Sequence, residues 1–120
     1  MMAATNGTGE TMENDSVADD LRESVVLLCE AVGGPGCVLE VGYLALRGPS
    51  GATAVHRFGV IVEPSVQGAL IGKGGKNAER MRELLRTRLS VLGRWEGVEM
   101  RTAGDRDEIR EMEGATWGAP

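Results

Sequence analysis

The segment that most constrains the fold is LIGKGGKN, residues 70–77, which places three glycines and two lysines within residues 72–76. Such a cluster does not continue a helix, because glycine loses much backbone entropy on folding and readily adopts positive φ angles. Directly after it, residues 76–93 (KNAERMRELLRTRLSVLG) carry apolar side chains at three- and four-residue spacing, which predicts an amphipathic helix. The chain therefore has to turn sharply just before its most strongly predicted helix.

Two segments upstream predict a β-hairpin. Residues 37–47 (CVLEVGYLALR) and 52–63 (ATAVHRFGVIVE) are rich in aliphatic and β-branched side chains, and they flank residues 48–51 (GPSG), whose composition is typical of a turn. His56 lies in the second strand. We interpret it as a paired or surface residue and not as a catalyst, because no nucleophile accompanies it.

Three further elements complete the pattern. Residues 16–32 have helical apolar spacing, and residues 16–19 (SVAD) have the spacing of a capping box at its start. After the second strand, Ser65 is suited to cap a short helix over residues 66–71. Residues 97–102 (GVEMRT) alternate between apolar and polar side chains, which predicts a short last strand.

The expected order is thus α-β-β-α-α-β. The two helices between the second and third strands form a right-handed crossover, so these two strands should run parallel. The helices then cover one face of a three-stranded mixed sheet, which gives an α+β, two-layer sandwich. We assign this domain to residues 15–103. The acidic segments 1–14 and 104–120 are expected to be a disordered tail and a flexible tail, the latter with at most a brief helical turn around Ile109.

Composition excludes several functions. Two cysteines and one histidine provide neither a disulfide framework nor a metal-ligand set, and no carboxylate pair or Cys–His couple predicts an enzyme, so no catalytic residue, metal or cofactor is expected. The sequence shows no signal peptide and no apolar run approaching roughly 18 residues, so a cytoplasmic location and no membrane contact are expected. The net charge is −5, yet residues 68–94 hold seven bases and two acids. This local positive field favours an anionic partner.

The glycine segment has the chemistry of an anion-binding site. Gly72, Gly74 and Gly75 let a ligand approach the backbone closely, because they have no Cβ. The unpaired amides at the start of the next helix direct partial positive charge toward the loop, and Lys73 and Lys76 add cations.

Two nucleotide-binding motifs fit the same glycines less well. A P-loop would need GxxxxGK[ST], but the spacing from Gly68 to Gly72 is one residue short, and Gly74 replaces the hydroxyl that would bind magnesium. A dinucleotide-binding GxGxxG pattern would need glycine where Asn77 stands. A tight turn between helices that binds nothing remains an alternative.

Residues 70–75 (LIGKGG) resemble the I-G-x-x-G signature of KH domains, and the expected element order is that of the type II, bacterial KH arrangement. The longer run VEPSVQGALIGKGGKNAERMRELL, residues 62–85, is similar in spacing to the small bacterial single-KH RNA-binding proteins, the KhpA-like family. The resemblance covers roughly residues 17–102. It implies binding of single-stranded RNA with weak sequence preference, and either a homodimer or pairing with a second KH-containing RNA-binding protein.

The resemblance also implies roles for individual residues. A GXXG loop clamps the backbone of about four unpaired nucleotides while the bases lie on an apolar floor. The last strand, over residues 98–100, would form the opposite wall of the groove. The residues implied to bind RNA are Ile71, Gly72, Lys73, Gly74, Gly75, Lys76 and Arg80, with Ala78 and Met81 as further candidates for the floor.

A function from a different class stays open. The chain could be a KH-like protein–protein interaction module that no longer binds RNA and works through its hairpin or acidic tails. The intact GKGG segment, which carries a lysine and no acid, favours RNA. Arg82, Arg86 and Arg88 have a second interpretation as a solvated helix face balanced by Glu79 and Glu83.

Overall fold

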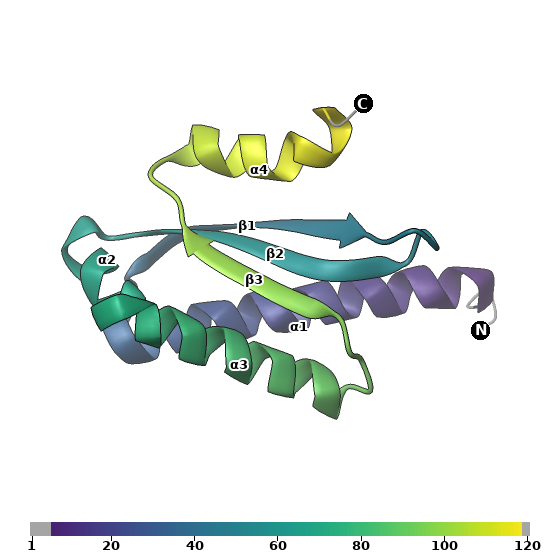
Figure 1. Ribbon diagram of the computed structural model, residues 1–120, viewed down its shortest axis with the longest axis horizontal. Coiled ribbons are helices and arrows are strands. Elements are labelled where there is room, and N and C mark those ends of the chain that lie inside the picture. The colour runs from purple at the N-terminus through teal and green to yellow at the C-terminus, as the bar shows by residue number, and fades with distance from the viewer. Residues whose placement is uncertain (1–5, 119–120) are drawn as a thin grey trace.

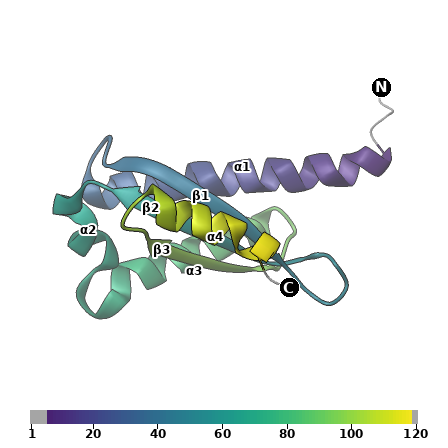
Figure 2. The same ribbon diagram turned by 90° about the horizontal axis from the view of Figure 1, so that it is seen from above.

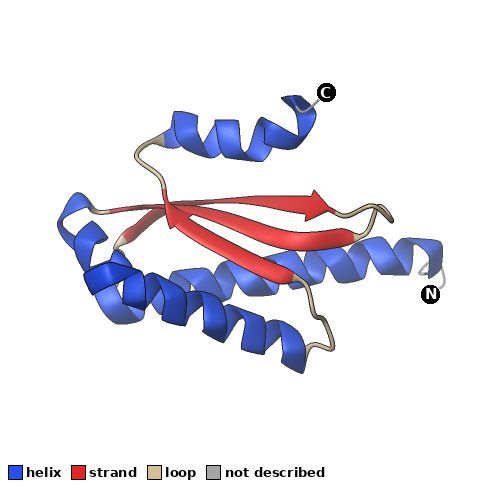
Figure 3. Ribbon diagram, viewed as in Figure 1, coloured by secondary structure: helices blue, strands red, loops and turns tan. Residues whose placement is uncertain are grey.

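The computed structural model describes residues 6–118, and the side chains of residues 16–113. The predicted order α-β-β-α-α-β with a three-stranded mixed sheet is confirmed, and one further helix follows it (Figure 1 and Figure 3). The elements are α1 (Asn6–Gly33), β1 (Val38–Arg47), β2 (Thr53–Val62), α2 (Pro64–Ile71), the 3-10 turn η2 (Lys73–Gly75), α3 (Lys76–Val91), β3 (Gly97–Thr102) and α4 (Arg106–Gly118).

The sheet has the strand order β1-β2-β3. Strands β1 and β2 pair antiparallel, as expected for a hairpin, and β2 pairs parallel with β3, with Phe58 opposite Met100. The parallel pairing follows from the crossover through α2 and α3. Helices α1 and α3 lie side by side below the sheet in Figure 1.

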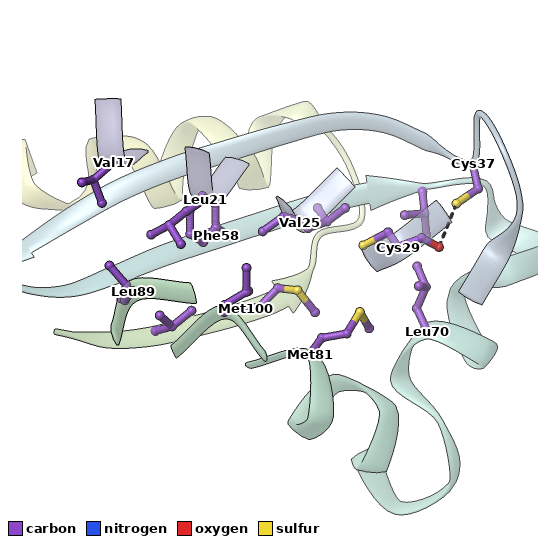
Figure 4. Packing of buried hydrophobic residues seen from close by; sticks show 14 residues of the cluster. Val17, Leu21, Val25, Cys29, Cys37, Phe58, Leu70, Met81, Leu89 and Met100 are labelled. Atoms are coloured by element: carbon purple, nitrogen blue, oxygen red, sulfur yellow. Dashed lines mark hydrogen bonds between the residues drawn. The ribbon is translucent and has the colours of Figure 1, made fainter. Parts of the chain in front are cut away.

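The core lies between the sheet and these helices. Alternate residues of β2 face it, and Phe58 is fully buried against side chains of α1 and α3 (Figure 4). Cys29 is buried, and its thiol is free. Burial raises the pKa of Cys29 to about 11, so this thiol is a poor nucleophile. The buried apolar cluster contains Val17, Leu21, Val25, Cys29, Cys37, Phe58, Val60, Val62, Leu70, Met81, Leu85, Leu89, Val98 and Met100.

The starts of α1 and α2 differ from the prediction. Helix α1 begins at Asn6, so the expected capping box at residues 16–19 lies inside the helix, and residues 6–14 are helical where a disordered tail was expected. A helix propagates one residue at a time once its first turn exists, so packing of the later turns allows this extension. Helix α2 starts at Pro64 with Glu63 as its N-cap, and not at Ser65. Residues 1–5 lie outside the described residues.

Helix α4 covers the face of the sheet opposite α1 and α3 (Figure 1 and Figure 2). The sequence instead predicted a flexible tail over residues 104–120 and helices on only one face of the sheet. The cause is a pair of glycines: Gly42 and Gly59 lie opposite each other on β1 and β2 and leave a flat surface on which Ile109 and Met112 become buried. The carboxylate of Glu113 accepts a hydrogen bond from the backbone N–H of Tyr43 at 3.0 Å. This hydrogen bond satisfies the backbone N–H of Tyr43 on β1, which is an edge strand of the sheet.

Substituting Gly42 tests this packing. A Cβ at residue 42 would lie 2.5 Å from Cγ2 of Ile109, whose β-branched side chain adjusts little. We expect Gly42→Ala to lower the free energy of unfolding by about 1–3 kcal/mol, as overpacking does, in urea denaturation. Gly97→Ala is the matched control, because its Cβ would have no neighbour nearer than 3.5 Å. Equal stability of the two variants would show that α4 does not pack against this surface.

A bidentate ion pair connects α1 with α3. Nε and Nη2 of Arg88 donate to the two carboxylate oxygens of Asp20 at 2.8 and 2.7 Å. The hydrogen bonds from Arg88 hold the pKa of Asp20 below its ordinary value. Arg88 therefore belongs to the fold and is not simply balanced by the acids of its own helix.

The pH dependence of stability tests this pair. We expect Asp20→Asn to lower the free energy of unfolding by about 0.5–1 kcal/mol at neutral pH, since both side chains are partly exposed. Because the folded-state pKa is depressed, this contribution is present above the unfolded value of about 4 and is lost as pH falls through the folded pKa. Urea denaturation at pH 7 and near pH 2.5 measures it. Asp107→Asn, which changes an exposed pair within α4, is the control; a difference that does not shrink in acid would contradict the assignment.

Candidate nucleic-acid interface

The GKGG loop owes its shape to positive φ angles at each of its glycines. Gly72, Gly74 and Gly75 have φ angles of 77°, 65° and 78°, a region that residues with a Cβ rarely adopt. At Gly72 space is also limiting, because a Cβ there would lie 2.8 Å from the backbone nitrogen of Asn77. At Gly74 and Gly75 a Cβ would meet nothing within 4 Å. The loop is therefore anchored at its start and open at its tip.

Asn77 holds the two sides of the loop together. Its Nδ2 donates a 2.7 Å hydrogen bond to the carbonyl oxygen of Ala69 in α2. Helix α3 then starts after Gly75, its N-cap, which makes no side-chain hydrogen bond to the first amides. These amides direct partial positive charge to the loop, which suits an anionic group.

A groove of about 370 Å³ lies between this loop and β3. Ile71, Gly74, Gly75 and Ala78 form one side of it, and residues 100–102 form the other. The structure thus brings together four residues that the sequence assigned to the loop or the floor and the strand proposed as the opposite wall. The complete lining is Cys29, Val60, Leu70, Ile71, Gly74, Gly75, Ala78, Glu79, Arg82, Met100, Arg101 and Thr102.

Two candidates for this groove lie elsewhere. Met81 is only 3% exposed and belongs to the core, because its position on α3 faces the sheet. Val98 does not line the groove but is buried farther along β3. Gly72 is not part of the lining either, and its contribution is the shape of the loop.

The cations beside the loop are available to a ligand. Lys73, Lys76 and Arg80 are exposed, and none of them makes an ion pair with any residue whose side chain is described. They stand around the loop and not inside the groove. Two arginines line the groove itself, Arg82 and Arg101, and neither was among the residues that the sequence implied to bind RNA.

A signal for both arginines was present in the sequence. Arg82 stands four residues after Ala78 and therefore shares its helix face. Arg101 follows Met100 in the strand that forms the groove wall. From the sequence alone, the role of the arginines of α3 was ambiguous, because a solvated helix face and a ligand-binding helix face have the same composition.

Of the two predicted roles for His56, a paired or a surface residue, the structure shows the first, because its ring is buried away from the groove and both ring nitrogens have partners. Its Nδ1 lies 2.8 Å from the hydroxyl of Tyr43, and its Nε2 lies 2.9 Å from Oε1 of Glu96. Burial alone would raise the pKa of Glu96, but hydrogen bonds from Arg94 and His56 outweigh it and hold the pKa below its ordinary value. This network fixes the loop between α3 and β3.

The part of the chain that the structure describes contains neither a metal-binding cluster nor a membrane-spanning helix. Among the described side chains, those of residues 16–113, no group of three or more His, Cys, Asp or Glu is arranged to bind a metal ion. None of the helices in residues 6–118 combines the length and the apolar composition that crossing a membrane requires.

Comparisons with known proteins bear on the fold. No protein-family model and no curated protein matches the chain. Among solved structures, the chain is similar to Era in complex with MgGDPNP and nucleotides 1506–1542 of 16S ribosomal RNA, with a TM-score of 0.50 and 17% identity over 82% of this chain and 35% of that chain. It is also similar to an Era variant of Aquifex aeolicus bound to GDP·AlF4⁻, with a TM-score of 0.46 and 20% identity over 85% and 35%.

The likeness to the RNA complex of Era shows the fold at this level of identity. The α-β-β-α-α-β order and the mixed sheet match the KH-like region of Era. The chain spans about a third of the length of these Era chains. The resemblance to single-KH proteins stays a prediction.

Proposed function

We propose that this chain binds single-stranded RNA and that its GKGG loop clamps the sugar-phosphate backbone. The observation that carries the proposal is the position of the loop: Gly74 and Gly75 form the rim of a groove whose other wall is β3, and Lys73 and Lys76 stand exposed beside it. Glycines without a Cβ allow the backbone of a nucleic acid to approach closely, and the lysines neutralise its phosphates. This is a binding function and not a catalytic one.

The groove divides the ligand between two environments. Phosphates would lie at the loop, near Lys73, Lys76 and Arg80, while bases enter the groove and contact apolar atoms of Ile71 and Ala78. An RNA helix presents no unstacked bases, so the groove favours a single strand. With few bases enclosed, sequence preference is weak.

The structure of Era that this chain resembles holds nucleotides 1506–1542 of 16S ribosomal RNA. This supports RNA as the ligand class for a KH-like fold. A single module of this size would bind weakly, so we propose that self-association or a second KH-containing RNA-binding protein raises the avidity.

A double substitution in the loop tests the clamp. We expect Lys73→Asp combined with Gly74→Asp to weaken binding of a mixed-sequence, single-stranded RNA by at least about tenfold, since it places negative charge where phosphates would lie. Fluorescence anisotropy measures the affinity, and circular dichroism checks the fold. Structural damage should be small, because a Cβ at Gly74 has free space and aspartate tolerates positive φ.

The matched control is Arg47→Asp at the end of β1 combined with Gly51→Asp in the turn that follows. It changes the net charge equally, and Gly51 also has a positive φ with free space around a Cβ. Equal affinity of the two double variants would contradict the clamp. If the wild type binds no RNA, the alternative of a protein-interaction module takes its place.

The salt dependence of binding provides a second test. On single strands, each phosphate contact contributes about 0.7 to the slope of log K against log salt concentration. We therefore expect Lys76→Ala to reduce the magnitude of that slope by about 0.7, whereas Arg47→Ala leaves it unchanged. Titrations at four or more salt concentrations measure it. An unchanged slope for Lys76→Ala would remove this residue from the interface.

A further inference from the structure

Trp95 is the most exposed large apolar side chain of the described residues, with 79% of its surface accessible. It stands in the short loop between α3 and β3. An indole in water forgoes roughly 2–3 kcal/mol of hydrophobic stabilisation that burial would provide, so its exposure needs a cause.

The loop itself holds Trp95 outward. The side chains on either side of it turn inward: Glu96 bonds to His56 at 2.9 Å and to Arg94 at 3.0 Å, and both charged neighbours are at most about one quarter exposed. The backbone N–H of Arg94 also donates to the carbonyl oxygen of Leu89 at 2.9 Å. Trp95 is thus presented to solvent by a fixed loop.

A pocket beside Trp95 is lined by the indole and by polar and charged side chains, in which two arginines balance two glutamates in formal charge. Its volume is about 600 Å³, and its lining is Glu83, Arg86, Thr87, Ser90, Arg94, Trp95 and Glu96. Arg86 makes no ion pair with any residue whose side chain is described, although Glu83 lines the same pocket. The pocket therefore combines one aromatic surface with an unpaired cation.

The pocket and the groove at the GKGG loop share no lining residue, but one face of α3 contributes to both. Ala78, Arg82, Arg86 and Ser90 recur every four residues and lie on one face of α3. Arg82 lines both the groove and a second pocket of about 290 Å³ along β3, and Arg86 and Ser90 line the pocket of Trp95. The row from Ala78 to Ser90 extends about 18 Å at the rise of an α-helix.

We propose that an RNA strand leaving the GKGG loop follows this row and stacks a base on Trp95, with its phosphates near Arg82 and Arg86. The proposal rests on the proposed RNA-binding function and extends its site beyond the loop. Aromatic surfaces interleaved with cations are the usual platform for single strands, because every base has a π face.

A protein partner fits this surface less well. The other strongly exposed apolar residues of α3, Leu84 and Val91, lie with Arg88 on a different helix face, where Arg88 pairs with Asp20 of α1. Apart from Trp95, the lining of the pocket is polar or charged. A protein-docking patch would require contiguous apolar area.

The experiment uses the full chain with Trp117→Phe, so that Trp95 is the only indole. Mixed-sequence RNAs of about four and about ten nucleotides are titrated, following both tryptophan fluorescence and anisotropy. We expect the longer RNA to quench Trp95. Trp95→Ala should weaken the longer RNA by about 5- to 100-fold, the range that base stacking confers, and leave the shorter one unchanged. Trp95→Phe should retain most of the affinity, and Val91→Ala, an exposed apolar residue on the other face, is the control.

The outcomes separate this inference from the proposed function. If the double substitution at Lys73 and Gly74 weakens binding while Trp95→Ala affects neither RNA, the clamp stands and the stacking role of Trp95 is overturned. If Trp95→Ala changes the oligomeric state in sedimentation but not RNA affinity, the indole serves a protein contact and the inference is likewise overturned. If the wild type binds neither RNA, both fall.

Discussion

The close approach between Gly72 and Asn77 sets the geometry on which the candidate site depends. A Cβ at Gly72 would lie 2.8 Å from the Asn77 backbone nitrogen, and Asn77 in turn bonds to Ala69 at 2.7 Å. These two contacts fix how α2 turns into α3. Since the first residues of α3 and the tip of the loop follow from that turn, the groove against β3 is a consequence of it.

Helix α4 explains which edge of the sheet is left for a ligand. It covers the outer face of the sheet, and Glu113 caps the Tyr43 amide on β1, the edge away from the groove. The backbone N–H of Ala103 donates to Val60, so by strand alternation the polar groups of Met100 and Thr102 point away from β2. The edge that borders the groove is therefore the one that α4 leaves uncovered.

Features that depend on local sequence could be predicted, and features that depend on register could not. The GKGG turn, the amphipathic α3 and the parallel pairing of β3 follow from glycine conformation, apolar spacing and crossover topology. Gly42 and Gly59 provide a surface for α4 only because the strand register places them opposite each other, so no local sequence pattern indicated the docking of α4. Likewise Met81 and Ala78 differ by less than one turn, yet one is in the core and the other lines the groove.

The distribution of charge shows how an acidic chain can present a cationic surface. Several of its ion pairs join elements of the fold: Asp20 with Arg88, Glu99 with Arg57, and Glu40 with Arg106. These arginines compensate acids and hold helices and strands together. The cations at the loop and along one face of α3 have no such partner among the described side chains, although acids are in excess in the chain.

Clustered like charges repel one another, so this arrangement lowers the stability of the free protein. Elsewhere in the fold, several charged side chains are paired. Where a surface lacks that pairing, the choice of residues reflects function and not folding. An anionic ligand would relieve that repulsion on binding. The expected dependence of affinity on salt is therefore a direct consequence of how the chain divides its cations between structure and surface.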